Sequence, residues 1–207
     1  MKLLAKLMAL FSIALVCGCS SMGGIPRDYA GADGGVLVAG LGAARGTSYS
    51  SYTMKYRTTN GAGEGSFRYL QENIFAATPR DFDDQAGNGF VAVQRLPPGD
   101  YEIYNFSIFH NGEMFQNYYS SRKDFSIKFK IVPGKTTYLG DFTAVRIQGR
   151  NFFGMPVPGG AYFVVSNKEE RDIAIARRKL PSIGQVEAAI PDALAVDNPF
   201  IQAKPLL

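Results

Sequence analysis

Apolar and polar residues alternate along much of the chain between residues 35 and 166. The clearest example runs from Phe125 to Ile131, where large apolar residues alternate with Ser126, Lys128 and Lys130. A period of two places the apolar side chains on one face of a strand and the polar side chains on the other. The pattern therefore predicts a series of half-buried β-strands.

Turn signals separate these apolar stretches. Asn60-Gly61, Asn88-Gly89 and Asn111-Gly112 each supply two adjacent residues that tolerate positive φ, which the commonest hairpin turn requires. Pro133-Gly134 and Pro158-Gly159 mark two further turns. The strands expected between these signals span residues 36–41, 52–57, 67–70, 90–93, 101–109, 114–119, 125–131, 137–147 and 161–165.

The pattern changes from strand to helix at Ser166. Ser166 and Glu169 form a capping-box sequence, acidic residues follow in the first turn, and residues 177–179 are all basic, as favoured at the end of a helix. Pro181 ends this helix, and a second, shorter helix is expected after it. We therefore expect a helical segment at residues 167–190 that packs against the strands.

Strands at this spacing, with no helix between them, indicate antiparallel pairing in a sandwich or a barrel. We expect a mainly β fold, namely one antiparallel β-sandwich over residues 35–166 with a short C-terminal helical segment. The tail at residues 191–207 contains three prolines and is expected to be extended or disordered.

The N-terminus has the three parts of an export signal. Lys2 and Lys6 give a positive start, the run Leu7 to Val16 is almost purely apolar, and Cys17-Gly18-Cys19 follows. The run is too short for a membrane-spanning helix, which needs about 20 residues. Val16-Cys17-Gly18-Cys19 resembles the lipobox of bacterial lipoproteins, which is an aliphatic residue, a small residue, Gly or Ala, and then the modified cysteine.

This resemblance implies removal of residues 1–18 and lipid attachment to Cys19, so that the protein is anchored without a membrane-seeking surface of its own. In lipoproteins, Asp after the cysteine typically signals retention in the inner membrane. Ser20 occupies that position and implies the outer membrane, on its periplasmic or its surface face. Residues 19–34 are small and polar, and we expect a flexible tether there.

Removal of the signal peptide changes the length, the net charge and the cysteine content of the protein. Without residues 1–18, 189 of the 207 residues remain, and the formal charge falls from +4 to +2 because the signal carries two lysines and no acid. The nearly neutral charge removes most of the case for nucleic acid as a partner. Cys17 leaves with the signal and Cys19 carries lipid, so no thiol is left for a disulfide, a nucleophile or a metal. We expect no cofactor and no metal.

A second resemblance concerns the turns. Leu96 to Tyr101, with the sequence Leu-Pro-Pro-Gly-Asp-Tyr, is similar to a turn in transthyretin-like and carboxypeptidase-regulatory-like β-sandwiches. Val132 to Lys135, followed by Tyr138 to Gly140, repeats the arrangement one strand pair later. The resemblance covers about a third of the domain and implies an architecture but no activity.

Two motifs superficially suggest cofactor binding or catalysis. Gly40, Gly42 and Gly46 are spaced almost like a dinucleotide fingerprint, but the third glycine is one place late and no helix follows, so a glycine-kinked strand is expected. His110 is the only histidine, and a Ser-His-Asp arrangement would need it together with Asp100, Asp124 or Asp141. Because His110 precedes Asn111-Gly112, we expect it at an exposed hairpin tip.

Carboxylates and tyrosines supply the other candidates. Asp81, Asp83 and Asp84 form the densest acidic group; they could bind calcium or act in glycoside hydrolysis, although a solvated connector is the simpler interpretation. The candidate binding residues flank turns and could form an aromatic platform for a sugar or a protein, or else be half-buried core residues. They are Tyr49, Tyr52, Tyr118 and Tyr119.

No catalytic constellation emerges, so we expect a structural or binding role in the cell envelope, with another envelope protein or peptidoglycan as the partner. The alternative is a cell-wall hydrolase that uses carboxylates. A converging acidic pair in a cleft would favour the hydrolase, whereas a tyrosine-rich face or an unprotected sheet edge would favour binding.

The anchoring prediction can be tested directly with Cys19→Ser. We expect the variant to lose the mass of the attached lipid and to leave the membrane fraction, because the substituted residue offers no thiol for acylation. Mass spectrometry and membrane fractionation of the wild type and the variant measure both effects. A variant that stays membrane-bound with an unchanged mass would contradict the prediction.

Overall fold

The computed structural model describes residues 28–71, 77–112, 116–150, 152, 154 and 156–205. The signal peptide expected at residues 1–18, Cys19 and the first part of the expected tether lie outside these described residues. Among the described residues, no helix has the length and apolar character needed to cross a membrane.

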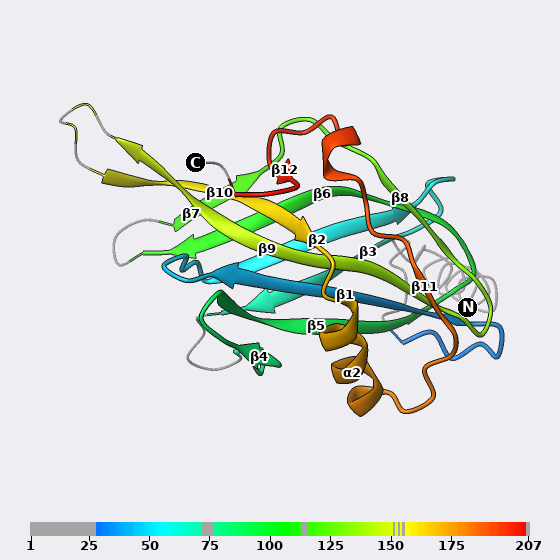
Figure 1. Cartoon of the computed structure of the whole chain (residues 1–207). Helices are drawn as coiled ribbons and strands as arrows, with labels where there is room; N and C mark the ends of the chain where they lie inside the picture. Colours follow the sequence, from blue (N-terminus) through cyan, green and yellow to red (C-terminus); the bar gives the residue numbers. More distant parts are fainter. Residues whose placement is uncertain are drawn as a thin grey trace, which may run out of the picture.

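Two sheets account for most of the described chain (Figure 1). The seven-stranded sheet has the order β12-β10-β9-β1-β5-β4, with β11 beside β9. Its strands are β1 (Gly35–Ala44), β4 (Phe82–Asp83), β5 (Gly87–Leu96), β9 (Thr136–Arg150), β10 (Pro156–Ser166), β11 (Val186–Ala188) and β12 (Ile201–Gln202).

The five-stranded sheet has the order β3-β2-β6-β7, with β8 beside β6. Its strands are β2 (Ser51–Thr58), β3 (Glu64–Leu70), β6 (Gly99–Asn111), β7 (Gln116–Ser120) and β8 (Ile127–Ile131). The predicted mainly β sandwich fold is therefore confirmed. Helix α2 (Glu169–Lys179) and the 3-10 turn η1 (Ala193–Ala195) complete the described elements.

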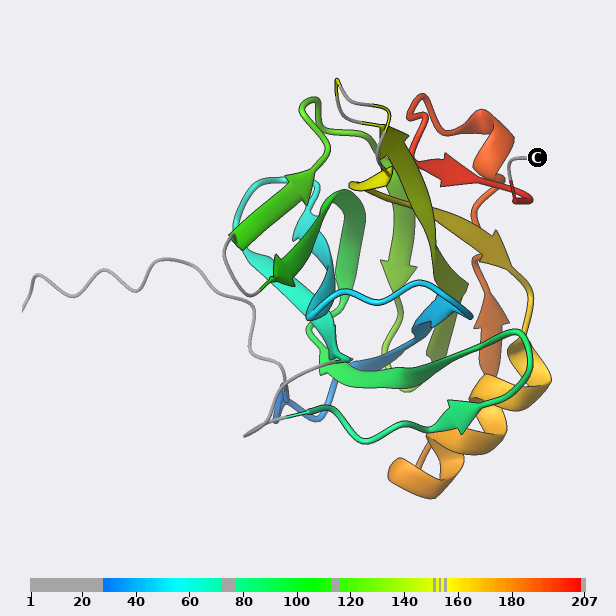
Figure 2. The ribbon, with the colours of Figure 1, turned by 90° about the vertical axis from the view of Figure 1, so that its left-hand side faces the viewer.

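The core lies between the sheets because the inward residues of both are large and apolar. Buried side chains of β1, β9 and β10 face those of β2, β6 and β8, and many are aromatic. A second, smaller cluster lies on the outer face of the seven-stranded sheet, where Ile173 and Ala176 of α2 pack near Val38, Val91 and Tyr138. Figure 2 shows α2 on this outer face.

The middle of the seven-stranded sheet is parallel. β1 pairs antiparallel with β5 but parallel with β9, and β10–β12 and β9–β11 are also parallel pairs. β1 is buried on both faces, which fits its continuous apolar sequence. The pairing of β1 with β9 is irregular between Val38 and Gly40, in agreement with the expected glycine-kinked strand.

Two of the three Asn-Gly turns are hairpins, as predicted. Asn60-Gly61 connects β2 with β3, and Asn111-Gly112 ends β6 before β7. Asn88-Gly89 instead lies inside β5, so the hairpin predicted there is wrong. Asn88 is buried, and its side-chain oxygen accepts a hydrogen bond of 2.6 Å from the Tyr69 hydroxyl, so tertiary contacts hold this segment extended.

The C-terminal region differs from the prediction in two places. Ser166 is the last residue of β10 and pairs with Asp141, so it does not cap a helix; α2 begins at Glu169, whose N–H donates to the Asn167 side chain at 2.9 Å. The second expected helix is also wrong, because Val186–Ala188 form β11. The tail contains η1 and β12 and packs on the sandwich, with Ile201 buried.

The turn at Pro97 is closed by the residue that leads the next strand. The Tyr101 hydroxyl donates a 2.7 Å hydrogen bond to the Pro97 carbonyl, and its ring is buried and stacks on Phe129 with the ring centroids 5.4 Å apart. The ring therefore fixes the strand to the core while its hydroxyl fixes the turn.

Tyr101→Phe is expected to lower the free energy of unfolding by about 1–2 kcal/mol, because the Pro97 carbonyl loses its donor in a partly buried position. The exposed Tyr118→Phe serves as the control and should change stability by less than about 0.5 kcal/mol. Urea unfolding of both variants and the wild type measures the difference. Equal stabilities for the two variants would show that the hydroxyl does not stabilise the turn.

Candidate functional site

A groove lies along one open side of the sandwich, where the edge of the five-stranded sheet faces the edge of the seven-stranded sheet. It has a volume of about 580 Å³. We call it the seam groove and define it by the residues that line it, which are Phe106, Tyr118–Lys123, Gly159–Ala161 and Asp197–Phe200. Figure 2 shows the two chain segments that flank it, the green chain around β7 and the red C-terminal segment.

The floor of the seam groove is aromatic. Phe106 lies at its base in contact with Phe200 of the C-terminal segment, with the ring centroids 5.6 Å apart. Tyr119 forms a side wall and packs over Gly160, where an added Cβ would lie 3.0 Å from the Tyr119 ring. Gly160 also has a φ of +88°, a conformation that favours glycine. The glycine therefore lets Tyr119 lie close to β10.

The C-terminal segment and the chain after β7 hold the groove in shape. The Asn198 amide donates to the Ser121 hydroxyl at 2.8 Å in a buried position. At the rim, Lys123 lies 3.5 Å from Asp197, and both side chains are almost fully exposed. Arg122 is exposed beside them. The rim is therefore basic, with one carboxylate that partly offsets the charge.

The structure divides the four candidate tyrosines between surface and core. Tyr118 is 72% exposed and stacks on Phe109 with the ring centroids 4.5 Å apart. Tyr119 is half-buried in the groove wall, whereas Tyr49 and Tyr52 are buried.

The buried tyrosines support the wall of the groove. The Tyr49 ring makes edge-to-face contacts with Tyr119 and Tyr52, each at 6.0 Å between centroids, and its hydroxyl donates to the Gly160 carbonyl at 2.7 Å. Burial raises the pKa of Tyr49, so it stays a neutral donor. Tyr118 and Tyr119 are thus the ones that line the groove, with Tyr49 behind them.

The other parts of the groove are not predicted from the sequence. Phe200 belongs to the C-terminal tail. Arg122 and Lys123 follow strand β7, and the sequence does not indicate which segment lies beside that strand in space. An exposed basic pair directly after an uncharged, tyrosine-containing strand was the one local signal. The pairing of Phe200 with Phe106 has no local signal, because the two residues lie far apart in the sequence.

A second groove lies on the opposite open side, between β3 and β5, with a volume of about 400 Å³. Arg68, Gln94 and Lys179 are among its lining residues. The start of the described chain covers part of this edge, because Asp28 forms a parallel bridge with Arg95 and the Tyr29 N–H donates to the Arg95 carbonyl at 2.9 Å. Part of this second edge is therefore already paired with the chain itself.

His110 does not form a catalytic arrangement with the expected aspartates. Its ring is half-buried against Tyr49 at 5.5 Å rather than fully exposed, and its Nδ1 has no hydrogen-bond partner among the described residues. The aspartates that could have completed a triad are engaged elsewhere. Asp124 binds Arg57, Asp141 binds Arg171, and Asp100 pairs weakly with Lys130.

The acidic group at residues 81–84 has structural partners. Asp81 accepts from the Val91 N–H at 2.7 Å and pairs with Lys179, while Asp84 accepts from the N–H groups of Ala86 and Gly87. These backbone bonds lower the pKa of Asp84. A general acid needs the opposite shift.

Asp83, the third member, is held between two arginines. Hydrogen bonds from Arg80 and Arg45 lower its pKa. No group of acidic, histidine or cysteine side chains within the described ranges is arranged to hold a metal ion. This connector therefore has the features of a stabilised turn, and the lowered pKa values of Asp83 and Asp84 do not favour proton donation.

One pair of carboxylates does converge, beneath α2. Arg171 donates to Asp141 and Asp172, each at 2.8 Å, and the Tyr138 hydroxyl donates to the other oxygen of Asp172 at 2.8 Å. The Thr143 hydroxyl completes the set by donating to Asp141 at 2.7 Å. All four carboxylate oxygens therefore accept a hydrogen bond, and both aspartates are buried.

Two acids share a single arginine in this cluster, so its charges do not cancel. Burial raises the pKa of Asp172, and the nearby Asp141 adds to that effect against the influence of Arg171. A narrow pocket of about 160 Å³ adjoins Asp141 and Arg171, but Asp172 is not among its lining residues. The pair fixes α2 to the sheet and does not face an open cleft together.

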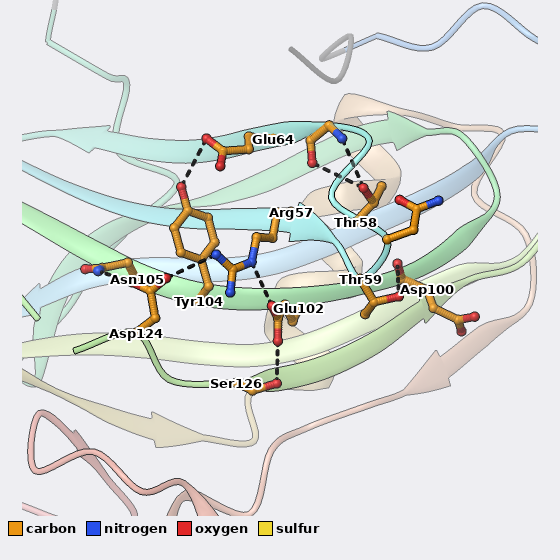
Figure 3. A network of polar contacts seen from close by, with 12 residues as sticks. Arg57, Thr58, Thr59, Glu64, Asp100, Glu102, Tyr104, Asn105, Asp124 and Ser126 are labelled. Carbon is orange, nitrogen blue, oxygen red and sulfur yellow. Dashed lines mark hydrogen bonds and ion pairs between the residues drawn. The ribbon is translucent and has the colours of Figure 1, made fainter. Parts of the chain in front are cut away.

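The outer face of the five-stranded sheet carries a third polar group, shown in Figure 3. Arg57 donates to Glu102 at 2.7 Å and to Asp124 at 3.1 Å, and its guanidinium lies 4.4 Å above the Tyr104 ring. The Ser126 hydroxyl donates to Glu102, and with Arg57 it lowers the pKa of that residue. The face of the Tyr104 ring and the carboxylates of Glu102 and Asp124 therefore already contact neighbouring side chains, as is usual on a sheet face that is exposed to solvent.

Comparisons with known proteins give no relative. No family model matches the chain, and neither a curated protein nor a solved structure matches it.

The buried cluster predicts a pH dependence. Because the folded protein raises the pKa of Asp172, it binds that proton more tightly than the unfolded chain does. The contribution of Asp172 to the free energy of unfolding therefore falls as the pH rises from the ordinary aspartate pKa through the raised one. Asp172→Asn removes this term, so the stability of the variant relative to the wild type should rise with pH over that interval.

Urea unfolding at a series of pH values from about 2 to 8 measures this difference, because the range must include the region below the ordinary aspartate pKa, where the control changes. Asp83→Asn is the matched control, because the folded protein lowers the pKa of Asp83 and the relative stability of that variant should change with the opposite sign. Parallel curves for Asp172→Asn and the wild type would contradict the assignment.

Proposed function

We propose that the chain is a lipid-anchored lipoprotein of the bacterial outer membrane that acts as a binding module, with the seam groove as its binding surface. The lipobox-like segment ending at Cys19 supports the anchor. The observation that supports binding is the groove itself, which joins an aromatic floor, an exposed tyrosine and a basic rim at the edge of a sheet.

The partner is an envelope protein in this proposal. A groove of this volume with aromatic walls and a few polar groups has the general features of a ligand-binding site, and the residue types favour a protein among the possible ligands. Tyrosine and arginine, both present here, are the residue types that most often dominate binding energy at protein interfaces. A mixed aromatic and basic surface suits a polypeptide with both apolar and acidic side chains.

The hydrolase alternative has less support. Glycosidases use two carboxyl groups on either side of the scissile bond, one of them with a raised pKa. In the described structure, the converging pair of Asp141 and Asp172 is buried and fully hydrogen-bonded. Asp83 and Asp84 have lowered pKa values.

A photo-crosslinking side chain placed at Tyr118 in the membrane-anchored protein tests the proposal in living cells. We expect one dominant protein adduct, because Tyr118 is exposed at the edge of the groove. The same side chain at Arg178, exposed on α2, is the matched control and should not give that adduct. Mass spectrometry identifies what is captured.

Other outcomes would contradict the proposal. Adducts of equal yield at both positions, or none at Tyr118, would show that the groove is not the binding surface. Capture of peptidoglycan fragments instead of a protein would show that the groove binds the cell wall and not an envelope protein.

A further inference from the structure

β7 is an edge strand that lacks the usual protection against pairing. In the described sheet it pairs with β6 alone, and its sequence, Gln-Asn-Tyr-Tyr-Ser, contains no charged residue and no proline. Natural edge strands are commonly protected by charges, prolines, bulges or very short length. β3, at the opposite edge of the same sheet, carries Glu64 and Arg68, and the edges of the other sheet, β4 and β12, have two residues each.

The seam groove runs beside this unprotected edge. A strand that lies in the groove would meet the backbone N–H and C=O groups of β7 that face away from β6, and main-chain pairing of this kind is a common mode of peptide recognition. Because side chains of a strand alternate, every second residue of the added strand would face the aromatic floor at Phe106 and Phe200. The site therefore fits an extended chain with alternating apolar residues.

The positive charge at the rim of the groove adds a second requirement for the bound peptide. β7 leads directly into Arg122 and Lys123, which are both exposed. The carboxylate of Asp197 lies near Lys123, whereas Arg122 forms no ion pair with any residue in the described part of the chain. An acidic side chain at that end of the added strand would meet this charge, which favours encounter and fixes the register.

We propose that the seam groove binds an extended peptide segment of a partner protein, which pairs with β7 and places an acidic side chain beside Arg122 and Lys123. This inference rests on the proposed function, since it names the chemistry of the partner for the same groove. It deepens that function by specifying backbone pairing rather than side-chain contact alone.

A random library of peptides about eight residues long, a length within the usual range of strands, is the probe. It is selected against the intact lipoprotein in detergent. We expect the selected peptides to share alternating apolar residues and one or more acids at one end. An N-methyl scan of the best peptide then tests for pairing, because only every second N–H of a paired strand points toward its neighbour. Binding should weaken at alternate positions and persist at those between.

Charge reversal tests the rim. Arg122→Glu combined with Lys123→Glu should weaken binding of the acidic peptide about tenfold or more. Lys128→Glu combined with Lys130→Glu makes the same change of charge on the exposed face of β8 and should alter the affinity by less than about twofold. Urea unfolding of both double variants shows whether each is folded.

The outcomes separate this inference from the proposed function. Peptides without acids, uniform sensitivity to N-methylation, an empty selection, or binding unaffected by charge reversal would each overturn the strand-pairing proposal. If Tyr118 still gave its specific adduct in cells, the binding role of the groove would stand without it. If that adduct were absent, the proposed function itself would fail.

Discussion

The fold depends on one strand, β1, that is buried on both of its faces in the middle of the larger sheet. Its inner face meets the core, and its outer face must be covered by α2. Gly40 makes this possible, because an added Cβ would lie 2.3 Å from the Asp141 carboxylate and 2.8 Å from that of Asp172. Because Gly40 has no side chain, there is room for the buried carboxylates of Asp141 and Asp172, which together with Arg171 attach α2 to the sheet. Removing one partner of such a cluster typically costs about 3–5 kcal/mol, since an uncompensated charge is left behind.

Covering the larger sheet on both faces determines where the molecule can bind. The outer face of the smaller sheet is occupied by charged pairs such as Arg57–Glu102. The two open sides of the sandwich carry the two grooves between the sheets. On one side, Asp28 and Tyr29 of the chain itself pair with β5. On the other, the tail approaches β7 but leaves the seam groove between them. An open edge beside an aromatic floor is thus a consequence of how the sheets are covered.

The sequence predicts what local patterns determine. Alternation located most strands, and Asn60-Gly61 and Asn111-Gly112 located two hairpins because their backbone preferences act within a few residues. Contacts between distant segments prevailed elsewhere. Asn88 stays in a strand because Tyr69 binds its side chain, and Ser166 pairs with Asp141 instead of capping a helix. The same limit applies to the groove: Tyr118 and Tyr119 were identifiable from the hairpin, whereas Phe200 and Gly160 reach the site only through tertiary packing.

The position of the first described residues relates the anchor to the groove. Asp28 bridges Arg95 at one end of the sandwich, while β7 and the start of β10 lie toward the other end (Figure 1). The chain from Cys19 to Asp28 has nine Cα-to-Cα steps and spans at most about 30 Å when fully extended. With lipid on Cys19, as proposed, the end near Asp28 would stay close to the membrane surface. The seam groove lies beside β7 and Asp28 is not among its lining residues, so this anchor would leave the groove accessible to a partner in the aqueous phase. Access from the aqueous phase suits a protein partner, in agreement with an edge strand that offers backbone hydrogen bonds.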